Sequence, residues 1–329
     1  MNFVIVGTNF ICDTFLQGAL STKAFNFYGL CSRSNNSAQD FLAKYQSHPL
    51  STKIFNSIDE VCADKNVDAV YIASPNSLHA QQAIQCLNAK RHVLGEKPSA
   101  ANNAQLQQMI TVAKQNNCLY MEAFMTTHLP NFAILQQQLP RIGRMRKYIG
   151  QYSQYSSRYQ QYLQGNTPNW CKPEFANGAL VDLGIYPLGL LISLWGKPDK
   201  VLASGILLDS GVDGAGDLLL SYTDKQAVIS YSKINNGDNI SEFQGELGRI
   251  EIKFVSLLRE ITLYLNNGLV EKISLPLVDG FMKYELAHFI QLAQENKTES
   301  PINSYLFSTQ LMTIMDEARQ QIGVKYPLT

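Results

Sequence analysis

The sequence predicts an α/β protein in which a doubly wound parallel sheet is followed by a second domain built mainly on an antiparallel sheet. The chain has 329 residues, which is enough for two domains. Apolar, β-type runs alternate with helical patterns up to about residue 122. Beyond that point, helices are followed by strand-type runs that turn residues separate. We therefore expect domains at 1–122 and 123–329.

Short apolar runs in the first part predict strands that helices cover on both faces. These runs stand at 3–6, 27–31, 69–73, 92–94 and 118–121. The patterns between them predict helices at 10–20, 37–45, 57–64, 76–88 and 102–115. The third of these helices opens with the capping-box pattern Ser57-Ile58-Asp59-Glu60. Because a helix follows each strand, the strands should lie parallel in one sheet.

The second part opens with helical patterns at about 130–139 and 178–195. A strand is predicted at 144–156, because β-favouring residues there outweigh the helical spacing of the tyrosines. Apolar stripes at helical spacing close the chain over 286–293 and 307–322. The stretch 199–275 predicts a mostly antiparallel sheet, divided by Asp209-Ser210-Gly211, Asn235-Asn236-Gly237-Asp238 and Asn266-Asn267-Gly268.

Charge and cysteine content limit the class of partner. Basic and acidic residues both number 27, so no net charge attracts nucleic acid or an anionic membrane. We expect a small-molecule substrate and further copies of the chain as partners. The 6 cysteines form no ligand cluster, which predicts no metal site and favours free thiols in the cytoplasm. Asp182 and Pro187 within the most apolar stretch favour a buried helix over a membrane span.

The turn after the first strand is Gly7-Thr8-Asn9-Phe10-Ile11-Cys12. It occupies the position in which a dinucleotide-binding fold places G-x-G-x-x-G, where a helix N-terminus meets the pyrophosphate. Asn9 replaces the second glycine and should carry its side chain toward the phosphates. Taken alone, the turn fits an ordinary connection between a strand and a helix equally well.

The end of the second strand indicates which cofactor binds. An NAD site places an acidic residue about 20 residues after the glycine motif, whereas the 2′-phosphate of NADP requires Arg and hydroxyl groups. Ser32, Arg33 and Ser34 stand at that distance, with no carboxylate nearby. NADP(H) is therefore the preferred cofactor and NAD(H) is possible. A solvated loop arginine is the alternative interpretation.

Four patches together resemble the Gfo/Idh/MocA family (glucose-fructose oxidoreductase, inositol dehydrogenase and MocA) over nearly the whole chain. The most specific patch is Gly95-Glu96-Lys97-Pro98. The others are the Gly7-Thr8 turn, Ser74-Pro75-Asn76-Ser77-Leu78-His79 and Gly178-Ala179-Leu180-Val181-Asp182-Leu183-Gly184-Ile185-Tyr186-Pro187. The resemblance implies a Rossmann domain followed by an α+β domain with a large open sheet. The implied cofactor-binding residues are Gly7, Thr8, Asn9, Phe10, Ile11, Ser32, Arg33, Ser34, Ser74, Pro75, Asn76, His79, Glu96 and Lys97.

Two of these patches follow predicted strands, so they should share one crevice at the carboxyl ends of the sheet. Lys97 can polarise a substrate oxygen and stabilise alkoxide charge, and Glu96 can orient the cofactor or Lys97. A surface ion pair between Lys97 and Glu96 is the alternative. His79 belongs to a family patch and could line the cofactor crevice, but a structural role is the stronger interpretation.

Asp182 and Tyr186 are spaced i, i+4, which predicts that both lie on one face of a helix. Many members of the resembled family have His at the second position, where it serves as acid and base. Tyr stands there in the branch that resembles dimeric dihydrodiol dehydrogenases. A phenol, with an ordinary pKa of about 10, is a poor base unless a cation such as Lys97 lowers that pKa. Packing of Tyr186 and a structural acceptor role for Asp182 are the alternatives.

The first functional hypothesis is an NAD(P)-dependent oxidoreductase that transfers a hydride between nicotinamide and a sugar, polyol or diol. Lys97 would polarise the oxygen, Tyr186 would relay the proton and Asp182 would position the substrate or Tyr186. A noncatalytic dinucleotide-binding sensor is the second hypothesis, because the glycine motif is eroded. A methyltransferase is the third, and it leaves Glu96-Lys97-Pro98 unexplained.

The second sheet also predicts a homodimer or homotetramer. Alternating residues at 228, 230 and 232 and at 250, 252 and 254 suggest a broad face that needs either helices or a partner, and few helices follow residue 200. These residues are Val228, Ser230, Ser232, Ile250, Ile252 and Phe254.

Overall fold

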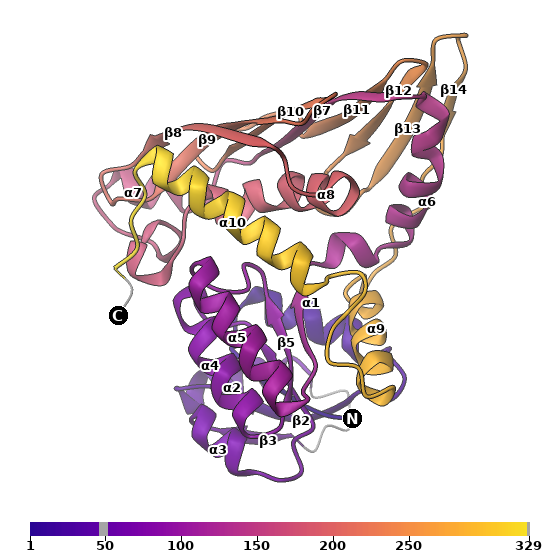
Figure 1. The fold of residues 1–329 in the computed structure, drawn as a ribbon. Coiled ribbons are helices and arrows are strands. Elements are labelled where there is room, and N and C mark those ends of the chain that lie inside the picture. Colours follow the sequence, from indigo (N-terminus) through magenta and orange to yellow (C-terminus); the bar gives the residue numbers. More distant parts are fainter. Residues whose placement is uncertain (46–51, 328–329) are drawn as a thin grey trace. The chain divides into compact units, whose positions relative to one another are not determined.

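The computed structural model describes residues 1–45 and 52–327, which form two compact units (Figure 1). The first unit combines Met1–Phe124 with Val278–Ser308, and the second combines Met125–Leu277 with the residues from Thr309 onward. A single boundary after residue 122, as expected from the sequence, therefore misplaces Val278–Ser308. That segment packs on the first unit, where the Gly18 position lies against the backbone of Gly280 and Lys283.

A six-stranded sheet in the order β3-β2-β1-β4-β5-β6 forms the centre of the first unit. All neighbouring strands are parallel, which confirms the predicted doubly wound sheet. The sequence missed β3, because this edge strand has only 3 residues and pairs with β2 alone. The strands are β1 (Asn2–Val6), β2 (Asn26–Cys31), β3 (Lys53–Phe55), β4 (Ala69–Ile72), β5 (His92–Glu96) and β6 (Tyr120–Ala123).

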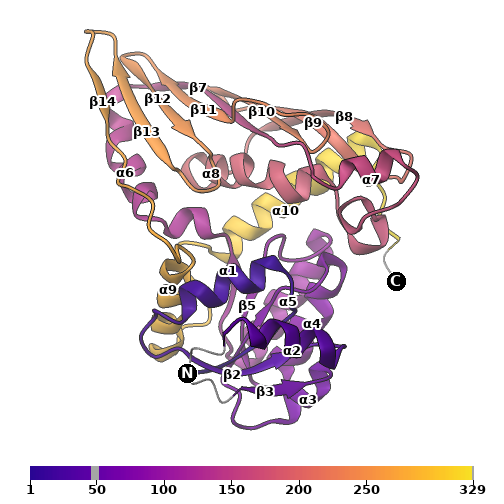
Figure 2. The same cartoon turned by 180° about the vertical axis from the view of Figure 1, so that it is seen from behind.

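The helices of the first unit lie close to their predicted positions. α4 and α5 lie on one face of the sheet and α1 on the other (Figures 1 and 2). Ser57 caps α3 by accepting the Glu60 N–H, while the Glu60 carboxylate accepts the N–H of Asn56. The helices are α1 (Phe10–Ala19), α2 (Asn35–Ala43), α3 (Ile58–Ala63), α4 (Asn76–Asn88), α5 (Asn103–Asn116) and α9 (Lys283–Gln294).

Aromatic packing fixes two helices of this unit on the sheet. Phe15 of α1 stacks on Tyr71 of β4, with ring centroids 3.7 Å apart and an interplanar angle of 7°. Phe289 of α9 meets Phe3 of β1 edge-on at 5.8 Å. Both helices are therefore held by β1 and β4, the strands between which the sheet order reverses and a ligand crevice is expected.

The second unit contains an eight-stranded sheet in the order β14-β13-β12-β11-β7-β10-β9-β8. It is antiparallel except between β7 and β10, which confirms the expected mostly antiparallel sheet. The strands are β7 (Met145–Ser153), β8 (Lys200–Leu207), β9 (Asp213–Ser221), β10 (Gln226–Ser232), β11 (Ile240–Gly245), β12 (Gly248–Lys253), β13 (Glu260–Leu265) and β14 (Val270–Lys272).

The apolar stretch Pro173–Trp195 is long and apolar enough to cross a membrane by composition, but 72% of its most apolar window is buried inside the protein. This burial is that of a core helix. A π-helical turn, Leu180–Gly184, leads directly into α8 (Ile185–Trp195). The other helices are α6 (Pro130–Gln138), α7 (Tyr159–Leu163), α10 (Tyr305–Ile322) and the 3₁₀ turns Met125–His128, Leu139–Ile142, Asn169–Cys171 and Pro173–Phe175.

The sequence predicted that Val228 and Ile250 lie on one broad face of the second sheet, but they lie on opposite faces. Ile250 and Ile252 are fully buried. Helix α8 and the end of α10 lie on one face of this sheet (Figure 1), where Gln321 of α10 accepts the N–H of Ala203 at 2.8 Å. Val228 and Ser230 alternate with buried neighbours and so lie on the opposite face. Of the two predicted alternatives, helices or a partner, helices of the same chain cover the face that contains Ile250 and Ile252.

Asp213 at the start of β9 supports the entry into the apolar helix. It is fully buried and accepts the N–H of Leu180 at 2.7 Å. Burial raises the pKa of its carboxyl group to about 6. The unfolded chain releases this proton near the ordinary pKa of about 3.9. The folded protein therefore binds the proton more tightly and loses stability as the pH rises from about 4 to 6.

We predict that the Asp213→Asn variant becomes more stable relative to the natural protein as the pH rises, because an amide does not titrate. Relative to the natural protein, its free energy of unfolding should rise by about 3 kcal/mol between pH 4 and pH 7. Urea unfolding at both pH values measures this difference. Any loss of stability that the amide causes equally at both pH values cancels in the comparison. Asp217→Asn on the same strand is the control, since Asp217 is exposed. A pH-independent difference for Asp213→Asn contradicts the raised pKa.

Candidate active site

Gly7 brings the carboxyl ends of three strands together. Its φ is +122°, a conformation that residues with side chains rarely adopt. Its N–H donates to the carbonyl oxygen of Cys31 at 3.0 Å. A Cβ at this position would stand 2.9 Å from the carbonyl oxygen of Ala73. The close approach of β1 to β4 therefore requires the first glycine of the turn.

Asn9 does not point toward the phosphate position, which corrects the sequence prediction. Its Oδ1 accepts the N–H groups of Ile11 and Cys12 at 3.1 and 3.2 Å, and its Nδ2 donates to the Ala73 carbonyl oxygen at 2.9 Å. Asn9 is thus the N-cap of α1 and ties the turn to the end of β4.

The remaining donors of this turn fit a dinucleotide. Among the described residues, the N–H groups of Thr8, Asn9 and Phe10 have no acceptor within the protein. They stand at the N-terminus of α1, where backbone donors and the helix dipole favour a phosphate group. The side chain of Phe10 is 80% exposed beside them. The residues present therefore fit a pyrophosphate.

The turn after β2 folds on itself and leaves its arginine exposed. The Ser32 hydroxyl donates to the carbonyl oxygen of Ser34 at 3.1 Å, and the Ser34 hydroxyl oxygen caps α2 by accepting the N–H of Ser37 at 3.3 Å. Arg33 projects between the two serines as an exposed residue. An exposed guanidinium beside a helix N-terminus fits a phosphate monoester.

Two buried carboxylates hold the backbone on either side of the cis Lys97–Pro98 peptide bond. Glu96 accepts the N–H of Lys97 at 3.2 Å and the Tyr71 hydroxyl proton at 2.5 Å. Glu122 accepts the N–H of Ser99 at 3.0 Å and the Ser308 hydroxyl proton at 2.6 Å. The turn that carries Lys97 is therefore held by hydrogen bonds to its main chain.

Burial raises the pKa of both carboxyl groups, whereas the donated hydrogen bonds oppose that rise. Glu96 is only 6% exposed. Of its two predicted roles, orienting Lys97 therefore fits the structure, and direct contact with a cofactor does not. Tyr71 and Glu122 were not among the predicted site residues, because their only signal in the sequence is a polar group within an otherwise apolar strand.

His79 lies beneath the site. It is 2% exposed, and its ring nitrogens contact the carbonyl oxygens of Pro98 and Ser74 at 2.9 and 2.8 Å. The Ser74 hydroxyl donates to Gln82 at 2.7 Å, and Pro75 is the N-cap residue of α4, which begins at Asn76. The structural interpretation of His79 therefore fits better than a place in the lining of the crevice.

The second unit contains a separate polar cluster around Asp182. The carboxylate of Asp182 forms an ion pair with Lys233, which follows β10, and the Lys233 side chain is only 11% exposed. Its ammonium group lies 5.3 Å from the ring centroid of Trp170. Lys233 was missed because 51 residues separate it from Asp182 in sequence.

Tyr186 packs against Tyr152 of β7, with ring centroids 5.8 Å apart. An i, i+4 spacing places two side chains on one face of a regular α-helix, but Asp182 belongs to a π-helical turn and Tyr186 to α8. Lys233, the partner of Asp182, follows the end of β10, and Tyr152, the partner of Tyr186, lies near the end of β7. These two strand ends are neighbours, because β7 and β10 are parallel and Tyr152 pairs with Tyr231. Both side chains therefore lie near one end of this strand pair.

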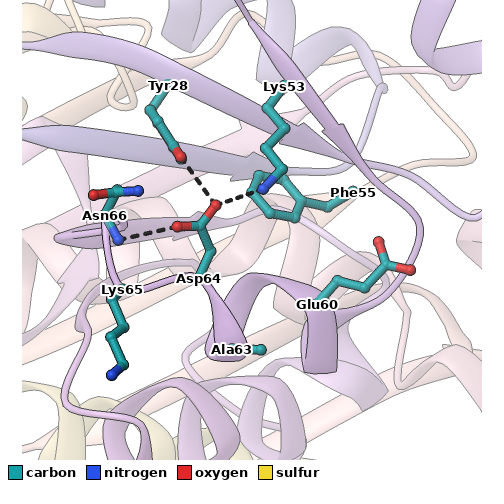
Figure 3. A pocket seen from close by; sticks show the side chains of 8 residues that line it. All are labelled: Tyr28, Lys53, Phe55, Glu60, Ala63, Asp64, Lys65 and Asn66. Atoms are coloured by element: carbon teal, nitrogen blue, oxygen red, sulfur yellow. Dashed lines mark hydrogen bonds and ion pairs between the residues drawn. The ribbon is translucent and has the colours of Figure 1, made fainter.

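A groove of about 530 Å³ beside β2, β3 and α3 is distinct from these clusters (Figure 3). Asp64 accepts hydrogen bonds there from the Tyr28 hydroxyl at 2.9 Å and from Lys53 at 2.7 Å. The Lys53 hydrogen bond lowers the pKa of Asp64 to about 2. The groove is lined by Tyr28, Lys53, Phe55, Glu60, Ala63, Asp64, Lys65 and Asn66, none of them a predicted site residue.

Comparison with known proteins agrees with this fold. Residues 1–124 match a family described as "Oxidoreductase family, NAD-binding Rossmann fold", and residues 141–251 match the "GFO/IDH/MocA C-terminal domain". The chain therefore belongs to the Gfo/Idh/MocA oxidoreductases and is an NAD(P)-dependent dehydrogenase or reductase that acts on CH–OH groups.

Among its relatives, scyllo-inositol 2-dehydrogenase (NADP(+)) IolU of Bacillus subtilis is 40% identical over 99% of this chain and 98% of that protein. Trans-1,2-dihydrobenzene-1,2-diol dehydrogenase of Xenopus tropicalis is 31% identical over 86% of each chain. The 3-ketoreductase KijD10 of Actinomadura kijaniata, solved with NADP and TDP-benzene, superposes with a TM-score of 0.86 over 99% of both chains at 23% identity. That last likeness concerns the fold.

Proposed function

We propose that this protein is an NADP(H)-preferring oxidoreductase of a polyol, sugar or diol. The observation that carries the proposal is the rigid mounting of the Lys97 turn next to a dinucleotide-type turn, at the carboxyl ends of one parallel sheet. Similarity over nearly full length to an inositol dehydrogenase and to dihydrodiol dehydrogenases supports this substrate class.

The dinucleotide would be held by the backbone donors of Thr8 and Phe10 and by Arg33. The first two suit the pyrophosphate, and the exposed Arg33 suits the 2′-phosphate of NADP. When bound, the nicotinamide ring supplies or accepts the hydride. The turn after β2 bears no carboxylate to hold free ribose hydroxyls, which supports a preference for NADP(H).

Chemistry at the CH–OH group needs a positive charge and a proton acceptor. We assign the charge to the Lys97 ammonium group, which stabilises the developing alkoxide, and the proton transfer to the Tyr186 hydroxyl. In the oxidation direction, the substrate hydroxyl would lose its proton to the Tyr186 side chain in its deprotonated, phenolate form, and in the reduction direction the Tyr186 hydroxyl would return that proton. The paired Asp182 and Lys233 offer an acceptor and a donor for neighbouring substrate hydroxyls.

We predict that Lys97→Met abolishes turnover and leaves the Kd of NADPH largely unchanged. Tyr186→Phe keeps the ring that packs on Tyr152 and should lower kcat about 10²–10⁴-fold, because it removes the phenolic oxygen that accepts and returns the proton. Steady-state kinetics measures both effects after sugars, polyols and aromatic diols have been screened. The matched controls are Lys65→Met and Tyr264→Phe. Near-natural turnover of Tyr186→Phe contradicts the proton-transfer role.

We predict that Arg33→Ala weakens NADPH binding about tenfold or more, because a charge-assisted contact to the 2′-phosphate contributes about 1.5–3 kcal/mol. NADH lacks that phosphate, so its affinity should not change and serves as the internal control. Fluorescence titration with both nucleotides measures the two values of Kd. Equal affinities for NADPH and NADH in the natural protein contradict the assignment.

The second sheet supports a proposal of self-association. Ile149, Val228, Leu219 and Leu202 pair directly across β7, β10, β9 and β8 and form a continuous apolar rung. Their strand positions alternate with buried residues, and Leu202 is 45% exposed. We propose that a second copy of the chain packs on this rung, in a homodimer or homotetramer.

We predict that Val228→Glu converts the oligomer to a monomer, because a carboxylate in an apolar interface is costly to desolvate. Light scattering after size-exclusion chromatography measures the mass. Leu163→Glu, which changes an exposed leucine on α7, is the control and should keep the natural mass. A natural protein that is monomeric at micromolar concentration overturns the proposal.

A further inference from the structure

Three cysteine side chains from three elements of the first unit gather in one cluster. Cys31 is the last residue of β2, Cys62 lies on α3, and Cys86 lies near the end of α4. Helices α3 and α4 are neighbours (Figure 1). Cys31 interacts electrostatically with both of the other cysteines. The functional site described above uses none of these three thiols.

Cys62 and Cys86 form the closest pair of this cluster. Their thiols are joined by a side-chain hydrogen bond that links α3 to α4. Arg91, which follows α4, connects the same two residues through the main chain. Its N–H donates to the Cys86 carbonyl oxygen at 2.9 Å, and its Nη2 donates to the Cys62 carbonyl oxygen at 3.4 Å. Hydrogen bonds from side chain and main chain therefore hold the two thiols together.

The two thiols differ in their access to solvent. All 6 cysteines lie in the part of the chain that the structure describes, and Cys62 is the partly exposed one among them. Cys86 is fully buried, and Cys31 is buried as well. A reagent that arrives from solvent therefore meets the sulfur atom of Cys62 first, with Cys86 directly behind it.

The two thiols also differ in acidity. The hydrogen bond from Cys86 lowers the pKa of Cys62, and the Arg91 guanidinium acts in the same direction. Burial and Asp59 oppose this shift. The same hydrogen bond, together with burial, raises the pKa of the Cys86 thiol. Cys62 therefore ionises first, and the thiolate is the form that attacks a disulfide.

We propose that Cys62 and Cys86 are a reactive thiol pair, which low-molecular-weight disulfides convert into a disulfide bond between α3 and α4. Cys62 is the attacking thiol and Cys86 is the thiol that completes the bond. This modification site goes beyond the proposed function, because it involves neither the nicotinamide cofactor nor the CH–OH substrate.

The reaction is a thiol–disulfide exchange in two steps. Cys62 releases its proton to solvent, and its sulfur atom attacks one sulfur atom of the small disulfide. The S–S bond of the small disulfide breaks, and its other sulfur atom leaves as a thiolate that takes a proton from solvent. Cys86 then releases its proton and attacks the Cys62 sulfur atom, which expels the second small thiol. Two electrons pass from the cysteine pair to the small disulfide, which is reduced to two thiols.

Oxidised glutathione is the probe for the natural protein. The folded full chain is incubated with an excess of it, the remaining thiols are alkylated, and the peptides are mapped by mass spectrometry without reduction. We expect one disulfide bond between Cys62 and Cys86, no glutathione retained on the protein, and the other cysteines alkylated. Dithiothreitol should return both thiols. This measurement needs no variant.

Three alanine variants assign the roles, since alanine places no polar group in the interior. Cys86→Ala should retain one glutathione on Cys62, because the thiol that completes the bond is missing. Cys62→Ala should take up no glutathione at Cys86, which is buried. Cys171→Ala is the matched control, because Cys171 is a buried cysteine of the second unit. It should form the natural disulfide bond at a rate within about twofold of the natural protein.

Three outcomes overturn the proposal. In the first, the natural protein keeps both thiols under these conditions. In the second, glutathione stays on Cys62 of the natural protein and no bond to Cys86 forms. In the third, the mapped disulfide bond contains Cys31. A natural protein that turns over no CH–OH substrate contradicts the proposed function alone, because peptide mapping reports the thiol pair without turnover.

Discussion

The site depends on the fact that backbone groups buried under the Lys97 turn must find partners without water. Glu96 and Glu122 provide them, at the cost of placing two carboxylates in the interior of the first unit. Such groups are tolerated when donors surround them, and each accepts one backbone N–H and one hydroxyl proton. Because both carboxylates accept main-chain N–H groups, the backbone of the turn is held on both sides of the Lys97–Pro98 peptide bond.

The same reasoning explains why the glycine motif can be eroded without loss of the turn. Gly7 is irreplaceable, because its φ and the nearby Ala73 carbonyl group leave no room for a Cβ. The second glycine position makes no such demand, since Asn9 there caps α1 and bonds to the end of β4. The hypothesis of a noncatalytic sensor took this substitution as decay. The structure instead shows that the Asn9 side chain makes three hydrogen bonds in this turn, which removes the premise of that hypothesis.

Sequence patterns predicted the elements that are marked by a local pattern of buried residues. They failed where a position in the fold depends on contact with a residue far along the chain. The strands at 69–73 and 92–94 were recognisable, because continuous apolar runs are typical of a strand covered on both faces. The stripe at 286–293 gave the buried face of α9 but not its docking on the first unit. In the same way, alternation at Ile250 showed that one face is buried, not that helices of the same chain cover it. Lys233 lacked any local signal beside Asp182.

The two units hold their functional groups by different physical means. In the first unit, main-chain contacts and buried partners fix the turns, so the shape of a dinucleotide site survives changes of individual side chains. In the second unit, the cluster consists of side chains packed on side chains: Tyr186 on Tyr152, and Lys233 between Asp182 and Trp170. In the proposed function, replacing any one of them would change which groups a substrate meets. On that proposal, the dinucleotide turn depends on the backbone of the first unit, whereas the choice of substrate would depend on a few side chains at the ends of β7 and β10.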